Sequence, residues 1–175
     1  MRNVNHVAVT IVIALVASLG ATFGSPSSSQ AVPYDDYFTS TVGINPGAVA
    51  VSPDGTKTFV ANKGNSSVSE VNAVTGDLLR TFSVGASPHA LAVTADGTEV
   101  FVVNYMGNSV TEIRLSDGET NTFLVGHWPT SIAISPDNTV AYVTNSDSDT
   151  ISVINITSDP ESSWSNLGAN VAVDG

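Results

Sequence analysis

The sequence predicts an all-β protein made of repeated four-stranded units, and two observations support this prediction. Gly43, Gly85, Gly126 and Gly168 are spaced 42, 41 and 42 residues apart, and each of the first three opens the same phrase. Between these glycines, short apolar or alternating runs are separated by turn residues, and no run keeps a helical periodicity. Four short antiparallel strands in a unit of about 40 to 45 residues are typical of a β-propeller blade.

The three copies agree at residues that shape strands and turns. The matching residues are Pro46, Pro88 and Pro129; Asp54, Asp96 and Asp137; Phe59, Phe101 and Tyr142; Asn62, Asn104 and Asn145; and Val68, Val110 and Ile151. This many matches in one register make chance a poor explanation of the repeat.

Each copy begins with a short apolar strand, as in Ala48 to Val51, and a tight turn follows. In such turns Pro presets φ, Asp bonds to nearby backbone, and Gly or Asn accepts a positive φ. We therefore interpret Asp54, Asp96 and Asp137 as turn formers rather than as repeated catalytic acids. The second strand, Thr58 to Asn62 in the first copy, is rich in Phe, Val and Ala.

A polar turn leads to the third strand, which alternates apolar and polar residues, as in Ile151 to Ile154. The fourth strand is weaker and more polar, and we place it at residues 78–84, 119–125 and 162–167. The continuous apolar character of the inner strands indicates burial between neighbouring blades, whereas the outermost strand is expected to face solvent.

The chain is predicted to be an incomplete propeller. We place blades at residues 43–84, 85–125 and 126–167, with a leading outer strand at 32–42 and a stub at 168–175 that resembles the first strand of a further blade. Three blades leave faces and edges unpaired, because closed propellers have about four or more blades. In order of preference, the alternatives are a truncated or split product of a longer protein, self-association of two copies into a ring, and an open arc.

Residues 1–31 have the order of a secretory signal peptide. Arg2 supplies the positive charge, Val7 to Leu19 form the apolar stretch, and small polar residues lead to a cleavage site after Ala31. The apolar stretch of about 13 residues is shorter than the roughly 20 that span a bilayer. We therefore expect an exported mature chain without a transmembrane segment, secreted, periplasmic or on the cell surface. Cleavage further upstream and an uncleaved anchor are the alternatives.

Composition excludes several kinds of site. The chain has no cysteine, which excludes disulfides and thiolate metal sites. Lys and Arg total 5 against 16 Asp plus Glu, and the net charge of −11 leaves little with which to neutralise phosphates, so nucleic acid is not an expected partner. The sequence has no phosphate loop, dinucleotide-binding glycine motif or nucleophile elbow, and no cofactor is predicted.

The second strands carry a family motif. The third copy contains Tyr142-Val143-Thr144-Asn145, and the first two contain Phe59-Val60-Ala61-Asn62 and Phe101-Val102-Val103-Asn104. With the segment from Val49 to Gly55, these residues resemble the YVTN repeat β-propeller family over essentially the whole mature chain. The resemblance implies an extracytoplasmic propeller, commonly of seven blades, as found on cell surfaces, in archaeal surface layers and in the periplasm. A more distant similarity, through Ser87-Pro88-His89, is to lactonase-type propellers.

Five residues are candidates for ligand recognition. His89 lies where the chain enters the first strand of its copy, near the expected central channel, and could act as a base or ligand. Tyr105, Met106, His127 and Trp128 are loop residues that could form a recognition surface if they share one face. Ordinary loop roles are the alternative for both histidines.

A further candidate ligand contact is Asn145, which ends a second strand as Asn62 and Asn104 do, although such an Asn more often bonds the loop into the third strand. Asp147 and Asp149 alternate in one loop and are candidate ligands for a hard cation such as Ca²⁺. They lack the glycine and the distal glutamate of an EF-hand loop, so a solvated hairpin tip is the alternative.

The sequence therefore predicts an exported propeller that acts as a non-enzymatic binding or interaction scaffold, with a protein or a cell-surface component as its partner. The alternative is a remnant of a lactonase-like or oxidoreductase-associated propeller enzyme. The functional expectation rests on the family resemblance, because one fold hosts many functions.

Overall fold

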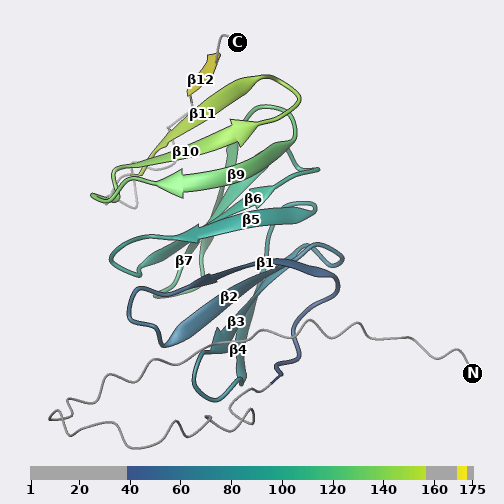
Figure 1. Ribbon diagram of the computed structural model, residues 1–175, viewed down its shortest axis with the longest axis vertical. Helices are drawn as coiled ribbons and strands as arrows, with labels where there is room; N and C mark the ends of the chain where they lie inside the picture. The colour runs from purple at the N-terminus through teal and green to yellow at the C-terminus, as the bar shows by residue number, and fades with distance from the viewer. Residues whose placement is uncertain (1–38, 157–168, 173–175) are drawn as a thin grey trace, which may run out of the picture.

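The computed structural model describes residues 39–156 and 169–172 of the chain. These residues form three four-stranded antiparallel sheets that follow one another as the blades of an incomplete β-propeller (Figure 1). The predicted all-β fold is confirmed. No helix in the described ranges is long and apolar enough to cross a membrane. The predicted signal peptide at residues 1–31 lies outside the described residues.

Within each blade, consecutive strands pair along the chain. The first blade contains β1 (Pro46–Val51), β2 (Lys57–Asn62), β3 (Ser67–Asn72) and β4 (Leu78–Ser83). The second contains β5 (Pro88–Val93), β6 (Glu99–Asn104), β7 (Ser109–Arg114) and β8 (Thr120–Leu124). The third contains β9 (Pro129–Ile134), β10 (Val140–Asn145), β11 (Thr150–Asn155) and β12 (Ala169–Ala172).

The turn between β1 and β2 forms for the reason that the sequence predicts. The carboxylate of Asp54 accepts hydrogen bonds from the hydroxyls of Ser52 and Thr56 and from the backbone N–H of Thr56. These bonds, led by that from Ser52, lower the pKa of Asp54 to about 2. Gly55 follows at φ 71°, and Asn138 takes its place in the third blade at φ 57°. Equivalent hydrogen bonds form at Asp96 with Thr98 and at Asp137 with Ser135 and Thr139.

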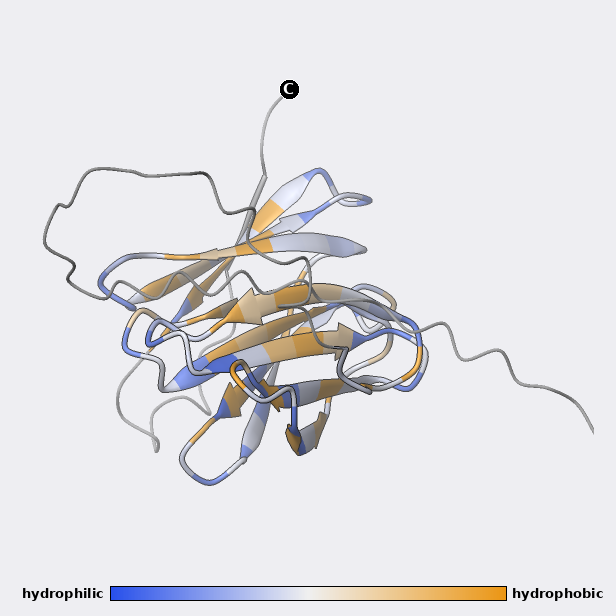
Figure 2. Ribbon diagram, turned by 60° about the horizontal axis from the view of Figure 1, so that its bottom comes forward, coloured by the Kyte–Doolittle hydropathy of each residue, from blue (hydrophilic) through white to orange (hydrophobic). Residues whose placement is uncertain are grey.

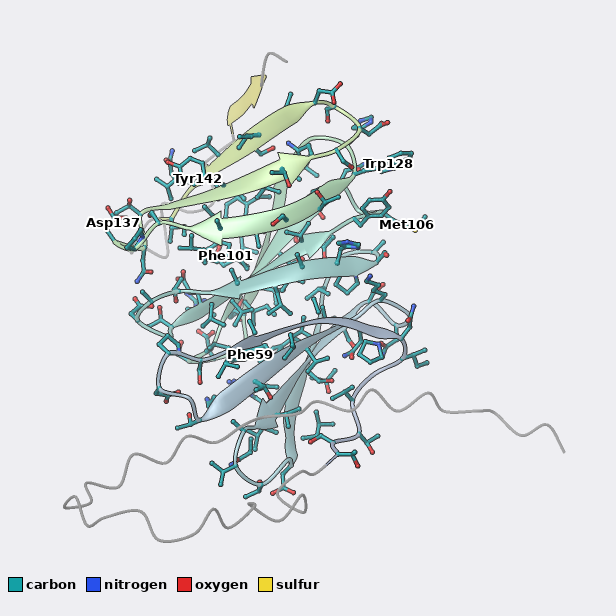
Figure 3. The ribbon with its side chains drawn as sticks, viewed as in Figure 1. Phe59, Phe101, Met106, Trp128, Asp137 and Tyr142 are labelled. Atoms are coloured by element: carbon teal, nitrogen blue, oxygen red, sulfur yellow. The ribbon has the colours of Figure 1, made fainter. Side chains whose placement is uncertain are left out.

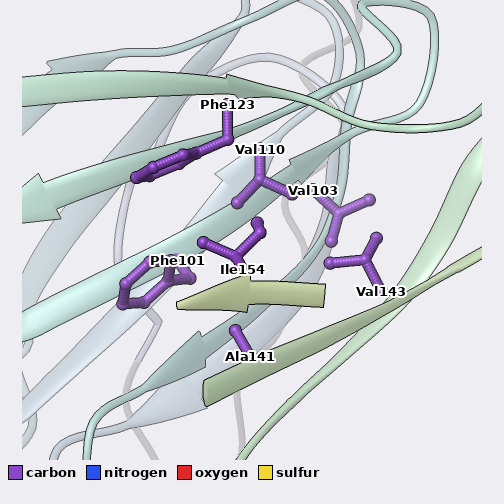
Figure 4. Packing of buried hydrophobic residues seen from close by; sticks show 7 residues of the cluster. All are labelled: Phe101, Val103, Val110, Phe123, Ala141, Val143 and Ile154. Carbon is purple, nitrogen blue, oxygen red and sulfur yellow. The ribbon is translucent and has the colours of Figure 1, made fainter. Parts of the chain in front are cut away.

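Two hydrophobic clusters join the blades, because apolar residues concentrate in the strands and polar residues in the turns (Figure 2). The cluster between the first and second blades contains Phe59, Val68, Phe82, Val100, Val102 and Ile113. The cluster between the second and third contains Phe101, Val103, Val110, Phe123, Ala141, Val143 and Ile154 (Figure 4). Hydrophobic burial between neighbouring sheets therefore holds the blades together.

One repeat position shows where this packing stops. Phe59 and Phe101 occupy the same place on β2 and β6 and are 0% and 1% exposed. Tyr142, their equivalent on β10, is 49% exposed, on a face of the third blade that no other described blade covers (Figure 3). The three blades thus form an open arc rather than a closed ring.

The end of the chain differs from the prediction. Residues 168–175 were expected to begin a further blade, but β12 pairs antiparallel with β11 as the outer strand of the third blade, with Ala169 opposite Val153. The β11 edge offers unpaired backbone groups that a short extended segment can satisfy, which explains the pairing. The strand predicted at 162–167 lies outside the described residues. So does most of the leading strand predicted at 32–42, of which residues 39–42 are not in a strand.

Removing the Phe101 ring should destabilise the fold strongly. Phe101→Ala leaves a cavity between the second and third blades, and we expect the free energy of unfolding to fall by about 3 to 5 kcal/mol. Leu124→Ala, at an exposed apolar residue of β8, is the control and should change it by less than about 0.5 kcal/mol. Urea unfolding followed by circular dichroism measures both. Equal losses would mean that the inter-blade cluster does not dominate stability.

Candidate functional site

A buried polar network repeats at one end of every blade. Asn104, the last residue of β6, donates hydrogen bonds through its side-chain amide to the hydroxyls of Ser109, at 3.1 Å, and Thr111, at 2.9 Å. Asn62 makes the same pair of bonds to Ser67 and Ser69, and Asn145 makes them to Thr150 and Ser152. The three asparagines therefore tie the end of each second strand to the start of the third.

The glycine that opens each repeat belongs to this network. A Cβ atom at Gly85 would lie 2.5 Å from the Asn104 amide nitrogen, so no larger residue fits beside the buried amide. The Gly85 N–H also donates to the Thr111 hydroxyl, at 3.3 Å. Gly43 and Gly126 approach Asn62 and Asn145 in the same way.

This arrangement gives Asn145 a structural role like that of Asn62 and Asn104. All three side chains are at most 2% exposed, and the Oδ1 atom of each accepts no hydrogen bond within the described part of the chain. The structural interpretation of these asparagines, bonding into the third strand, is the one that the hydrogen bonds support.

A pair of glycine substitutions tests the network. Gly85→Ala places a methyl group against the rigid, buried Asn104 amide, and we expect a loss of about 1 to 3 kcal/mol in the free energy of unfolding. Gly47→Ala is the matched control, because its methyl group would meet the far end of the flexible Lys63 side chain, which can move. Chemical denaturation of both variants measures the difference. A Gly85→Ala variant as stable as Gly47→Ala would contradict the close-packing argument.

Beside this network, at the same end of the blades, aromatic side chains from two blades come together. The rings of Tyr105 and Trp128 stack with centroids 5.9 Å apart and an angle of 25° between their planes. The His89 ring is a second neighbour of the Tyr105 ring, and the centroids of these two rings are 5.5 Å apart. We call His89, Tyr105 and Trp128 the aromatic row. Met106, next to Tyr105, is 71% exposed.

Backbone hydrogen bonds fix the loops that carry the row. The N–H of Tyr105 donates to the carbonyl of Ser87, at 3.0 Å. The N–H of Trp128 donates to Asn108 Oδ1, at 3.0 Å, and its carbonyl accepts from the N–H and hydroxyl of Ser146. Met106 and Trp128 project from one side of the stacked sheets, and the Asp137 turn lies on the opposite side (Figure 3).

Trp128 holds an unusual backbone conformation. Its φ is 50°, in the left-handed region that bulky residues rarely adopt. Asn45 and Ser87 occupy the same repeat position with φ of 52° and 55°, and small polar residues tolerate this conformation better. A tryptophan here carries a conformational cost that an asparagine would largely avoid.

The two histidines have different surroundings. Partial burial and, secondarily, the positive charge of Lys63 lower the pKa of His89, which favours the neutral imidazole. His127 lies apart from the row contacts and places Nδ1 3.6 Å from Asp147 Oδ2. The structure thus brings together His89, Tyr105 and Trp128, whereas the sequence analysis grouped Trp128 with Tyr105, Met106 and His127 and treated His89 separately.

The predicted cation ligands find a different setting. Asp147 faces His127, and Asp149 takes φ 51° at the position before β11 where Ser66 and Asn108 stand in the other blades. Within the described ranges no group of three or more His, Cys, Asp or Glu side chains is placed to hold a metal ion. The positive φ gives Asp149 a turn-forming role that needs no cation.

A pair of glutamates was missed by the sequence analysis. In the first blade, Glu70 is buried and forms ion pairs with Lys57, at 2.9 Å, and Arg80, at 2.6 Å. In the second blade the equivalent residues are Glu112, Glu99 and Asn121. Aligning the charged residues of the copies would have shown that both cations are lost. Burial, and then the charges of Glu112 and Asp96, raise the pKa of Glu99 to about 7, and burial also raises that of Glu112.

This pair predicts a pH dependence of stability. The ordinary pKa of Glu99 is 4.5, so between pH 4.5 and 7 the folded chain keeps a proton that the unfolded chain releases. Its stabilising contribution is therefore complete below pH 4.5 and is lost as the pH rises through 7. We expect urea unfolding to show lower stability at pH 8 than at pH 5.

Glu99→Gln should flatten this profile, because the amide does not titrate. Glu119→Gln, at an exposed position in the turn before β8, is the control and should keep the wild-type slope. A wild-type slope in Glu99→Gln would show that other groups cause the pH dependence.

Comparison with known proteins identifies the family. A family model described as Choice-of-anchor I domain matches residues 22–172, so the chain belongs to this family. No curated protein matches the sequence. Membership indicates a surface-associated β-propeller protein.

Solved structures agree on the fold. Hydrazine synthase of Kuenenia stuttgartiensis is 32% identical, with a TM-score of 0.63, over 71% of this chain and 39% of that one. A functionally unknown protein of Desulfotomaculum acetoxidans is 22% identical, with a TM-score of 0.61, over 78% and 44%. A Bacteroides fragilis protein assigned provisionally as a 6-phosphogluconolactonase is 16% identical, with a TM-score of 0.62, over 76% and 39%. The last two likenesses show the fold alone, and the chain spans 39 to 44% of the length of these structures.

Proposed function

We propose that this member of the choice-of-anchor I domain family is an exported binding scaffold that docks a protein partner on the aromatic row. The observation that carries the proposal is the stacked pair of Tyr105 and Trp128, contributed by two blades and left accessible beside the exposed Met106. Trp, Tyr and Met are enriched in the cores of protein interfaces, and Trp and Tyr dominate their binding energy.

The backbone of Trp128 supports the same conclusion. A tryptophan at φ 50° is conformationally costly, and its half-exposed ring gains little from burial within the chain. Such a residue is expected where the ring has a use outside the fold. The Tyr142-Val143-Thr144-Asn145 motif further supports assignment of the blades to the YVTN type and hence an extracytoplasmic location.

The scaffold is proposed to act without catalysis. The His89 ring contacts the Tyr105 ring, its lowered pKa favours the neutral imidazole, and within the described residues no acid or nucleophile forms a hydrogen bond with it. A lactonase-like activity would need such partners around a bound substrate. Lactone hydrolysis by the purified protein that disappears in His89→Ala would overturn this part of the proposal.

Site-specific photo-crosslinking tests the binding surface. A benzophenone amino acid placed at Met106 should capture a partner protein on the cells that export the chain. The same probe at Asp137, on the opposite side of the stacked sheets, is the matched control and should capture it much less (Figure 3). Equal capture from both positions would contradict docking on the aromatic row.

Alanine substitution then measures the contribution of the row. Trp128→Ala and Tyr105→Ala should each weaken binding of the captured partner by at least about tenfold, as expected for interface aromatic residues. Leu124→Ala, which removes an exposed apolar side chain elsewhere, should leave the affinity unchanged. Titration calorimetry gives the affinities, and thermal melting confirms that the variants stay folded.

A further inference from the structure

Charged residues of opposite sign stand on the two sides of the aromatic row. Lys63 lies in the β2–β3 loop of the first blade, whereas Asp147 and Asp149 lie in the corresponding loop of the third blade. The loops between them, at residues 84–87, 105–108 and 125–128, contain no Lys, Arg, Asp or Glu. The end of the blades that carries the row is therefore positive on its first-blade side and negative on its third-blade side.

The positive charge of Lys63 is not matched by a carboxylate of the described chain. Lys57, Arg80 and Arg114 each form an ion pair with a carboxylate of their own blade, whereas Lys63 forms none with any described residue. The chain as a whole has 16 Asp and Glu against 5 Lys and Arg. A cation left unpaired in so acidic a chain, on a half-buried side chain beside an aromatic surface, is available to an anion from outside.

The Lys63 side chain reaches the His89 side of the row. Its Cε atom lies over Gly47, the residue of the first blade that corresponds to His89, so a Cβ atom at Gly47 would overlap it. The backbone N–H of Lys63 donates to the carbonyl of Asn45, at 2.9 Å, which fixes the start of the loop. After partial burial, the charge of Lys63 is a cause of the lowered pKa of His89, so the ammonium is close enough to act on the imidazole.

Lys63 and His89 together offer hydrogen-bond donors of the kind that a carboxylate needs. The ammonium has three N–H groups and a neutral imidazole has one, and neither side chain donates to another residue in the part of the chain that the structure describes. A carboxylate only accepts hydrogen bonds, and bonds from a charged donor are about twice as strong as neutral ones. From this point the rings of Tyr105 and Trp128 continue as an apolar surface.

We propose that the protein partner places an acidic side chain, Asp or Glu, on Lys63 and His89, and an apolar or aromatic neighbour of that acid on Tyr105 and Trp128. The inference rests on the proposed function and names the chemistry of the segment that the aromatic row binds. It assigns the acid to the first-blade side of the row and the apolar contact to the second and third blades.

The charges of the chain fix the direction and the composition of this segment. An acid placed at the Trp128 side would meet the like charges of Asp147 and Asp149, which is unfavourable. The net charge of −11 also repels strongly acidic proteins at long range. A single acid among neutral and apolar residues therefore fits the surface better than an acidic tract.

Selection from a library of displayed random peptides tests the proposal on the full exported chain. The carboxyl end of each peptide is joined to the carrier, so a carboxylate can come only from Asp or Glu. Peptides that bind the wild-type chain and are lost with Trp128→Ala should be enriched in a single Asp or Glu next to an apolar residue. Lys63→Glu should change that preference to Lys or Arg. An unchanged preference would overturn the contact.

Titration calorimetry then measures the contact with a selected peptide, synthesised with an amidated end. Lys63→Met keeps the aliphatic stem, removes the charge, and should weaken binding by at least about fivefold. Arg114→Met is the matched control, because it removes the same charge at the far end of β7 and should change the affinity by less than about twofold. Thermal melting shows that both variants stay folded.

A second change, made in the peptide, separates a direct contact from a general effect of charge. Replacing the acid of the peptide by its amide should weaken binding to the wild-type chain as much as Lys63→Met does. Combining the two changes should cost little more than either alone, because both remove the same interaction. Losses that simply add would overturn the proposal.

The outcomes distinguish this inference from the proposed function. Peptides that depend on Trp128 but show no preference for an acid would overturn the acid contact and leave the binding scaffold standing. A library that yields no Trp128-dependent peptide would also overturn the inference. The proposed function would then depend on whether photo-crosslinking from Met106 captures a partner.

Discussion

In the first two blades both faces of the sheet are apolar, and each such face needs another layer to cover it. The need follows from the short inner strands, which place branched and aromatic residues on both sides of a thin sheet. Phe101 is covered because it packs against the third blade, and burying such a side chain stabilises the fold by about 1.5 to 3 kcal/mol. Tyr142 has the same place in its repeat but no such neighbour among the described residues, and its side chain stays half exposed.

A second constraint acts within each blade and is polar. The amide of Asn62, Asn104 or Asn145 is buried and must be hydrogen-bonded, because an unpaired buried donor is costly. Hydroxyls at the start of the third strand accept these bonds, and a glycine must then pass close to the amide. The glycine spacing, the first signal of the repeat, therefore marks a packing requirement rather than a flexible turn.

These two constraints explain how much could be predicted. The strands, their order and the Asp54-type turns are set by local chemistry that recurs three times. Each copy of the repeat therefore supports the prediction made from the other two. Contacts between blades recur less faithfully. The stacking of Tyr105 on Trp128 depends on how neighbouring blades are rotated, which no single repeat encodes. The glutamate pair of Glu99 and Glu112 escaped notice because its meaning lies in a difference between copies.

The residues that differ between the copies are the candidates for a function beyond folding. The residues that the copies share are those that the two constraints require, and their roles end inside the fold. The residue after each strand-ending asparagine and the residue before each proline are required by neither, and they vary: Lys63, Tyr105 and Ser146; Asn45, Ser87 and Trp128. Where the backbone must take a positive φ, a small polar residue suffices, yet the third copy has a tryptophan. Its ring adds nothing to the repeat network and stacks on the one tyrosine among the variable residues, and this is why the proposed binding surface is placed there.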